Sequence, residues 1–184
     1  MPPYNLITPI ETARLLIRPP EMADAAHYVK LLDDWEIVRW TRRLPYPYSE
    51  ADAIQFIEAA AEHWRDRRGF PCTIARKSDE AVIGGIAATP DIEGGLEIGY
   101  WIGRTHWRQG FGSESVSAFT AAVRRDLAPD LLFGHVLPDN LASRQILNAA
   151  GFIFAGTRLI QSRDGPRSVL RFELRASRAG SAHH

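Results

Sequence analysis

The stretch WRQGFGSE, residues 107–114, lies between an apolar run typical of a β-strand and a pattern typical of a helix. Glycines at positions 110 and 112 allow a tight turn that brings several backbone N–H groups close to a ligand. The helix that follows begins with unpaired N–H groups and with the positive end of its dipole. The stretch predicts an anion site with pyrophosphate as the obvious ligand, although the glycines would also suit a plain turn.

Two other phosphate-binding motifs do not fit this stretch. A P-loop needs the pattern GxxxxGK[ST], and no Lys-Ser or Lys-Thr pair follows these glycines. A dinucleotide-binding fingerprint needs a third glycine at position 115, where the chain has Ser115.

A second segment, about thirty residues later, has the pattern of a capped helix. Its residues 139–152 read DNLASRQILNAAGF. Asn140 suits a helix N-cap, Ser143 a first-turn position, and Gly151 the position after the helix end. By itself the pattern predicts a helix over 141–150 and no particular function.

The remaining patterns predict the element order β-α-α-βββ-α-β-α-ββ. Strands are expected over 14–18, 70–76, 81–88, 96–102, 131–137, 152–156 and 168–174. Helices are expected over 22–32, from a capping box at residues 49–52 to about 69, over 112–125 and over 141–150. Residues 35–48 suggest a short helix followed by a loop. This order predicts an α+β domain built on a mixed sheet.

Composition excludes several classes of protein. The 22 basic residues balance the 22 acidic ones, so no general attraction to nucleic acid is expected. No segment approaches the roughly 18 apolar residues of a membrane span. The single cysteine, Cys72, cannot form an internal disulfide and lies in an apolar run, which predicts a buried thiol. Without a signal-peptide pattern, we expect a single domain of 184 residues in the reducing cytoplasm.

The histidines give no metal pattern. His106 and His135 lack ligand spacing with other His, Cys or carboxylate residues, and His183 and His184 stand at the chain end. We therefore expect no metal, and His135 is most simply a packed strand residue with a satisfied ring.

The strand LEIGYWI, residues 96–102, has a carboxylate opposite its apolar face. Alternation places the even-numbered residues on one face and Glu97 on the other, with Gly99 and Trp101. Gly99 would leave room for a water or an amine, and Trp101 would raise the pKa of Glu97 by desolvation. From the alternation alone, a strand residue that only faces solvent is the simpler interpretation of Glu97.

Taken together, the two motifs and the element order over residues 12–174 resemble the GNAT superfamily of N-acetyltransferases. Residues 107–112 are similar to its pyrophosphate motif, Q/R-x-x-G-x-G/A, and residues 140–152 to its N-x-x-S…G-F signature. Trp107 replaces the usual Gln or Arg, as in Rim-type members, which acetylate protein N-termini; residues 12–19, TARLLIRP, also look Rim-like. The resemblance implies a mostly antiparallel mixed central sheet flanked by about four helices.

The resemblance also implies roles for individual residues. Acetyl-CoA would be the cosubstrate, and a primary amine would attack it directly. Glu97 would be the general base, and Asn140 would hydrogen-bond the pantetheine arm. Ser143 would protonate the departing thiolate; many relatives have a Tyr in this role, this helix has none, and water would also serve. The residues implied for coenzyme binding are Tyr100, Trp101, Ile102, Arg108, Gln109, Gly110, Phe111, Gly112, Ser113, Glu114, Asn140 and Ser143.

The sequence indicates the acceptor less clearly than it indicates the coenzyme. By the resemblance, residues 35–48 and 161–167 form opposite walls of the acceptor site, with Trp35, Trp40 and Tyr46 as candidate contacts. These aromatic residues would equally serve to cover the sheet. A protein N-terminal α-amine is the first-choice acceptor. A small amine (an amino acid, a polyamine or an antibiotic), a non-catalytic acetyl-CoA sensor and a homodimer all stay open.

Overall fold

The computed structural model describes residues 6–92 and 94–176, and within them one sheet has the strand order β1-β2-β3-β4-β5-β6-β8-β7. The strands are β1 (Ile10–Glu11), β2 (Leu15–Arg18), β3 (Phe70–Arg76), β4 (Val82–Pro90), β5 (Leu96–Ile102), β6 (Leu131–Val136), β7 (Ile153–Ser162) and β8 (Gly165–Arg175). Only β5 and β6 pair in parallel; every other pairing is antiparallel. The predicted α+β fold with a mixed, mostly antiparallel sheet is confirmed.

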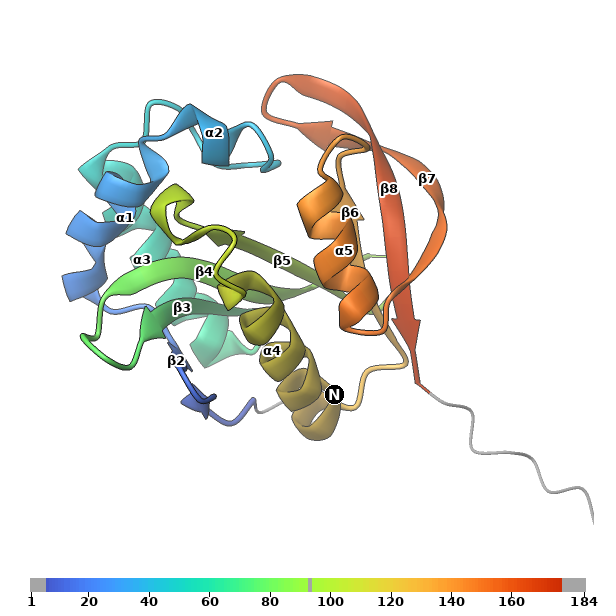
Figure 1. The fold of residues 1–184 in the computed structure, drawn as a ribbon, viewed down its shortest axis with the longest axis horizontal. Coiled ribbons are helices and arrows are strands. Elements are labelled where there is room, and N and C mark those ends of the chain that lie inside the picture. Colours follow the sequence, from blue (N-terminus) through green and yellow to red (C-terminus); the bar gives the residue numbers. More distant parts are fainter. Residues whose placement is uncertain (1–5, 93, 177–184) are drawn as a thin grey trace, which may run out of the picture.

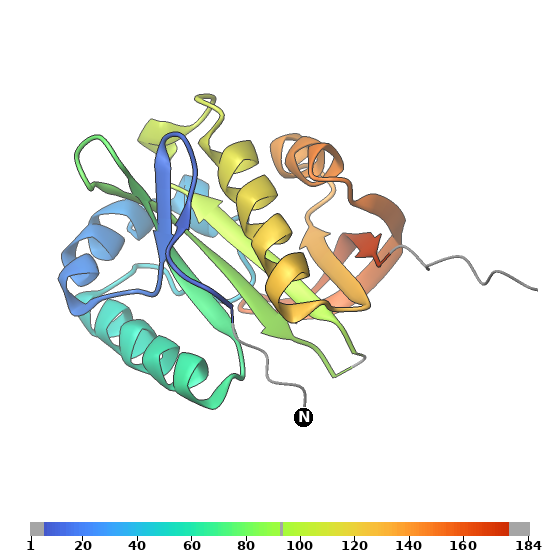
Figure 2. The same ribbon diagram turned by 90° about the horizontal axis from the view of Figure 1, so that it is seen from below.

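Helices cover both faces of this sheet (Figures 1 and 2). Helices α1 (Ala25–Leu32) and α3 (Glu50–Asp66) pack on one face, and α4 (Phe111–Leu127) and α5 (Leu141–Ala149) on the other. These are the four expected flanking helices. The short helix expected after residue 35 is α2 (Trp35–Val38), a single turn. Two 3-10 turns, Met22–Asp24 and Arg104–His106, complete the helical segments.

The two faces have separate hydrophobic cores. The larger core joins the sheet to α4 and α5, and Val116, Phe119 and Val123 of α4 are fully buried in it. The smaller core packs α1, α2 and α3 together over Val82. Within the described residues, no helix is both long and apolar enough to cross a membrane.

Three local features differ from the sequence prediction or sharpen it. The short strand β1 was not predicted, because two residues carry no periodic signal. Strands β7 and β8 are longer than expected. The sequence pattern underestimates β7 because it is an edge strand whose side chains are mostly exposed and do not alternate in polarity. The capping box at the start of α3 is confirmed, with Ser49 and Asp52 each bonding the other's backbone N–H.

Candidate active site

The site lies where two neighbouring strands separate. Strands β5 and β6 pair only at Leu96–Leu132 and Glu97–Phe133 and then diverge. A cavity of about 1020 Å³ lies here, lined by residues of β5, β6, the start of α4, α5 and the loop after α2. The glycine-rich turn and Glu97 thus face one continuous cavity, as the resemblance implies.

The glycine-rich turn has a left-handed backbone at two residues. Gly110 has φ +81° and Arg108 has φ +59°, both in the left-handed region. The first helical backbone hydrogen bond of α4 runs from the Glu114 N–H to the Gly110 carbonyl (3.0 Å). The N–H groups of residues 111–113 therefore precede the helical ladder, and all three residues line the cavity.

Trp107, which replaces the usual Gln or Arg of the motif, anchors this turn. Its indole N–H donates to the Ile102 carbonyl at 2.6 Å, which ties the turn to the end of β5. From the other side, the Arg14 guanidinium donates to the Gln109 carbonyl at 3.0 Å.

Two predicted coenzyme residues do not present their side chains to the cavity. The Glu114 carboxylate accepts hydrogen bonds from the Thr12 hydroxyl (2.5 Å) and from Arg14 Nε (2.7 Å). The Gln109 amide donates to the Thr105 carbonyl at 3.0 Å. Glu114 thus fastens the segment before β2 to α4, a role that no local sequence pattern indicates.

Glu97 is held at both of its oxygens. Oε1 lies 3.0 Å from His135 Nδ1, and Oε2 lies 3.1 Å from Arg42 Nη2. Its side chain is 21% exposed, and a side chain added at Gly99 would meet nothing within 4 Å. The open space expected beside the carboxylate is confirmed.

The expected rise in the pKa of Glu97 is wrong. Burial alone would raise it, but the His135 hydrogen bond and the charges of Arg42, His135 and Arg43 hold the pKa below its usual value. The indole of Trp101, expected to desolvate this carboxylate, lies over Gly85, where an added Cβ would lie 2.7 Å from Trp101 Nε1. Glu97 is therefore ionised at neutral pH.

His135 is part of the site, which corrects the expectation of a packed histidine with a satisfied ring. Because Glu97 is ionised and can only accept, His135 Nδ1 carries the proton that it donates. Its Nε2 is buried without a hydrogen-bond partner among the described residues. The parallel register pairs Glu97 with Phe133, so position 135 lies two residues further along the neighbouring strand.

A hydroxyl pair lies at the start of α5. The Asn140 side chain accepts from the Ser143 N–H at 3.0 Å, so the predicted N-cap is confirmed. The Ser143 hydroxyl lies 2.8 Å from the Tyr100 hydroxyl. Burial raises the pKa of Tyr100 to about 12, although the Ser143 hydrogen bond opposes the shift.

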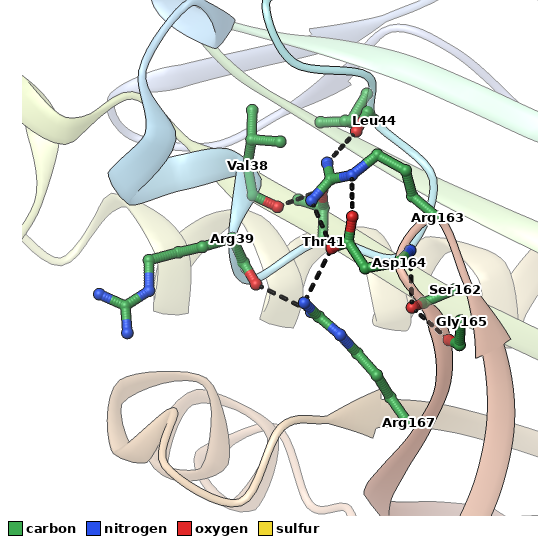
Figure 3. Close-up of polar contacts among 9 residues, drawn as sticks. All are labelled: Val38, Arg39, Thr41, Leu44, Ser162, Arg163, Asp164, Gly165 and Arg167. Atoms are coloured by element: carbon green, nitrogen blue, oxygen red, sulfur yellow. Dashed lines mark hydrogen bonds and ion pairs between the residues drawn. The ribbon is translucent and has the colours of Figure 1, made fainter.

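The two predicted acceptor walls are joined by hydrogen bonds (Figure 3). Arg163, in the β7–β8 turn, donates from its guanidinium to the Leu44 carbonyl and from its N–H to the Arg42 carbonyl (2.9 Å). Arg167 donates to the Arg39 carbonyl at 3.2 Å. These bonds join the loop of residues 39–44 to the hairpin, and we call the joined segments the roof.

Of the three aromatic residues predicted to contact the acceptor, one lines the cavity and two do not. Trp40 lines the cavity. Trp35 and Tyr46 pack against each other instead, with ring centroids 5.4 Å apart, and neither lines it. The Arg163 guanidinium lies 5.5 Å from the Trp35 ring, so this pair supports the roof from outside.

Cys72 is buried as expected. It is 1% exposed, and burial raises the pKa of its thiol, which keeps it protonated. Among residues 6–92 and 94–176, no three His, Cys, Asp or Glu residues gather in a way that would hold a metal ion. His183 and His184 lie outside the described residues.

Comparison with known proteins shows the family. The model of the acetyltransferase (GNAT) domain matches residues 14–153. The uncharacterized N-acetyltransferase YoaA of Bacillus subtilis is 31% identical over 145 residues, which are 78% of this chain and 81% of that protein.

Solved structures share the fold at lower sequence identity. Mycobacterium smegmatis RimJ, in complex with CoA-disulfide, superposes with a TM-score of 0.77 at 18% identity, over 88% of this chain and 82% of its own. RimL, a ribosomal L7/L12 alpha-N-protein acetyltransferase in complex with coenzyme A, gives a TM-score of 0.78 at 15% identity, over 90% and 97%. With its glycine-rich turn and splayed strands, the chain belongs to the GNAT acetyltransferase family and is an acetyl-CoA-dependent N-acetyltransferase.

Proposed function

We propose that this enzyme acetylates α-amines, in first place a protein N-terminus, by direct attack of the amine on acetyl-CoA. One observation carries the proposal: the ionised Glu97 carboxylate lies beside the open position at Gly99, where β5 and β6 separate. A carboxylate in such a place can accept the proton that the amine loses.

The residues present fit acetyl-CoA. The N–H groups of residues 111–113 and the left-handed turn at Gly110 would bind the pyrophosphate. The side-chain carbonyl of Asn140 accepts a hydrogen bond from the Ser143 N–H, so the amide N–H₂ of Asn140 can donate to the pantetheine arm. Backbone N–H groups of residues 100–102 would polarise the thioester carbonyl.

The proposed reaction needs two proton transfers. The amine nitrogen bonds to the acetyl carbon, and the sulfur leaves with the electron pair of the C–S bond. Glu97 accepts the proton from nitrogen, directly or through one water. The Ser143 hydroxyl gives its proton to the sulfur and is reprotonated by the adjacent Tyr100 hydroxyl or by water.

An α-amine suits this site because the site offers only a weak base to deprotonate the acceptor amine. At pH 7, deprotonating an amine with a pKa near 8 costs about 1.4 kcal/mol, against about 4.6 kcal/mol for a lysine near 10.4. Glu97, with its lowered pKa, is a weak base. RimL, named an alpha-N-protein acetyltransferase, shares the fold and so supports this choice by analogy.

A small-molecule amine is the second candidate. The roof joins the two walls of the acceptor side through the contacts of Arg163 and Arg167. A bridged acceptor side favours a short acceptor over a long folded one.

The test combines binding and turnover. Calorimetry with acetyl-CoA, with NAD as a control, should show micromolar binding to the wild type and to Glu97→Gln. Turnover on a panel of N-terminal peptides and small amines, followed by mass spectrometry, should fall about a hundredfold in Glu97→Gln. Glu62→Gln, an exposed glutamate on α3, is the matched control and should behave as wild type. A folded wild type that binds no acetyl-CoA, or equal turnover in Glu97→Gln, would contradict the proposal.

A further inference from the structure

The acceptor side of the cavity is strongly cationic although the whole chain is neutral. Two carboxylates, Glu97 and Asp164, stand here among four guanidiniums, those of Arg42, Arg43, Arg163 and Arg167. Of these charged residues, Glu97, Arg42, Arg43 and Arg167 line the cavity itself.

The arginines differ in how far their charges are already matched. Arg42 is paired with Glu97 at 3.1 Å. Arg163 and Arg167 share the Asp164 carboxylate, at 2.8 and 2.9 Å. Figure 3 shows these two guanidiniums on either side of Asp164.

Arg43 has no carboxylate partner and no hydrogen bond among the described residues. Its side chain is exposed and lines the cavity. Its charge nevertheless reaches the catalytic carboxylate, because it is one of the charges that lower the pKa of Glu97. The acceptor therefore meets an excess of positive charge next to the proposed base.

We infer that the acceptor is an amine that carries a carboxylate close to the reacting nitrogen. The inference rests on the proposed function and narrows its substrate class. Guanidiniums bind carboxylates through paired N–H donors, and Arg43 and Arg167 lie where such a group would enter. The same charges disfavour the protonated form of a nearby amine, so they increase the reactive neutral fraction. They also repel polyamines and aminoglycosides.

The carboxylate of the acceptor could be the α-carboxylate of a free amino acid or a side-chain carboxylate of a peptide, and matched pairs of acceptors distinguish the two. Free serine and serinamide differ in the α-carboxylate alone. The peptide amides Ser-Asp-Ala-Ala and Ser-Asn-Ala-Ala differ only in a side-chain carboxylate, and spermidine serves as the polycation. Initial rates of CoA release at saturating acetyl-CoA give kcat/KM for each, corrected for the neutral fraction of the amine.

We expect the carboxylate member of at least one pair to have a kcat/KM about tenfold higher, equivalent to about 1.4 kcal/mol, with spermidine the poorest acceptor. Arg43→Gln and Arg167→Gln should each reduce this ratio severalfold, mainly through KM, and Arg43→Lys should restore part of it. Arg158→Gln is the control: Arg158 is an exposed arginine of β7 that does not line the cavity and that, among the described residues, donates only to the adjacent Thr157 carbonyl.

The outcomes distinguish this inference from the proposed function. Turnover that favours neutral acceptors or spermidine, or a ratio that survives both arginine substitutions, overturns the inference and leaves the proposed function standing. Absence of turnover with every acceptor, despite acetyl-CoA binding, contradicts both.

Discussion

The hydroxyl of Tyr100 lies 2.8 Å from the hydroxyl of Ser143, which joins the middle of β5 to the first turn of α5. Burial keeps Tyr100 protonated at neutral pH, because its pKa is raised to about 12. Tyr100 can therefore donate to Ser143 and leave the serine proton free for the departing sulfur. The sequence motif supplied the serine, and the fold supplied a tyrosine beside it from another element.

Removing the hydroxyl of Ser143 or of Tyr100 should slow the protonation of the departing sulfur. We expect Ser143→Ala to lower kcat about 10- to 100-fold, and Tyr100→Phe, which keeps the ring, about 3- to 10-fold. If the two act in one relay, the double variant will be no slower than Ser143→Ala. A double-mutant cycle on kcat measures this, and fully additive losses would show that the hydroxyls act independently.

The pH dependence should follow the acceptor amine and not Glu97. The pKa of Glu97 is held below its usual value, so the proposed base is already ionised throughout the neutral range. For an α-amine peptide, kcat/KM should rise as pH increases from 6 and level off above the amine pKa, near 8. A profile controlled by a group of pKa 6 to 7 that is independent of the acceptor would contradict this assignment.

His135→Phe tests the same point from the opposite direction. The substitution removes the hydrogen bond that lowers the pKa of Glu97, and the ring keeps its packing. Since His135 Nε2 has no partner among the described residues, the substitution leaves no group except the Glu97 carboxylate without its hydrogen bond. The pKa of Glu97 should therefore rise, as measured by NMR titration of its carboxyl group, while acetyl-CoA binding and the amine-controlled rise of kcat/KM stay unchanged. An unshifted pKa would show that His135 does not control this carboxylate.

The sequence predicted the elements well wherever a periodic pattern existed. Strands β3 and β5 have the predicted bounds, and the capped starts of α3 and α5 are where Ser49 and Asn140 predict them. Strand β7 was predicted short, because side chains on an exposed edge strand need not alternate. Its length became visible only through pairing with β8.

The candidate site was predictable only in part. Glu97, Ser143 and the glycine turn lie in motifs that are local in sequence. His135 and Arg42 contact Glu97 from 38 and 55 residues away, and their approach depends on how β6 and the loop after α2 pack. No local pattern encodes those contacts. For that reason the pKa of Glu97 was predicted to shift in the wrong direction.

Gly112 gives a test of the coenzyme site. A Cβ at this position would lie 2.9 Å from Ile146 Cδ1, the flexible end of a side chain. Gly112→Ala should therefore bind acetyl-CoA within a few-fold of wild type after a small shift of Ile146. Gly112→Glu adds a negative charge at the proposed pyrophosphate site and should abolish binding in calorimetry. If the Glu variant folds and binds normally, the pyrophosphate lies elsewhere.

The roof should control the acceptor and not the coenzyme. Arg163→Ala removes the donor to the Leu44 carbonyl and the contact with Trp35. We expect the KM for the acceptor to rise about 3- to 10-fold, with coenzyme affinity unchanged. Arg158→Ala, an exposed residue of the same hairpin that donates only to the Thr157 carbonyl, is the control. Equal effects of the two substitutions on KM would show that the roof does not bind the acceptor.

A buried ion pair that does not itself line the cavity should contribute to the acid sensitivity of the fold. Asp24 is 3% exposed and accepts two hydrogen bonds of 2.9 Å from Arg18 and one of 2.8 Å from Thr73. Burial alone would raise its pKa, but these bonds, with one from the Glu21 N–H, hold the pKa below its usual value. A carboxyl whose pKa is lower in the folded state stabilises the fold above its unfolded pKa, near 3.9.

Asp24→Asn should therefore lower the free energy of unfolding at pH 7 by about 2–4 kcal/mol, because Arg18 loses its charge partner in a mostly buried place. As pH falls below about 4 and through the folded pKa of Asp24, the wild type loses the same contribution. The difference between the two proteins should then shrink. Urea unfolding at pH 7 and at pH 3.5 measures both values, with the exposed Glu58→Gln as control. A difference that stays constant between the two pH values would mean that the charge of Asp24 is not what stabilises the fold.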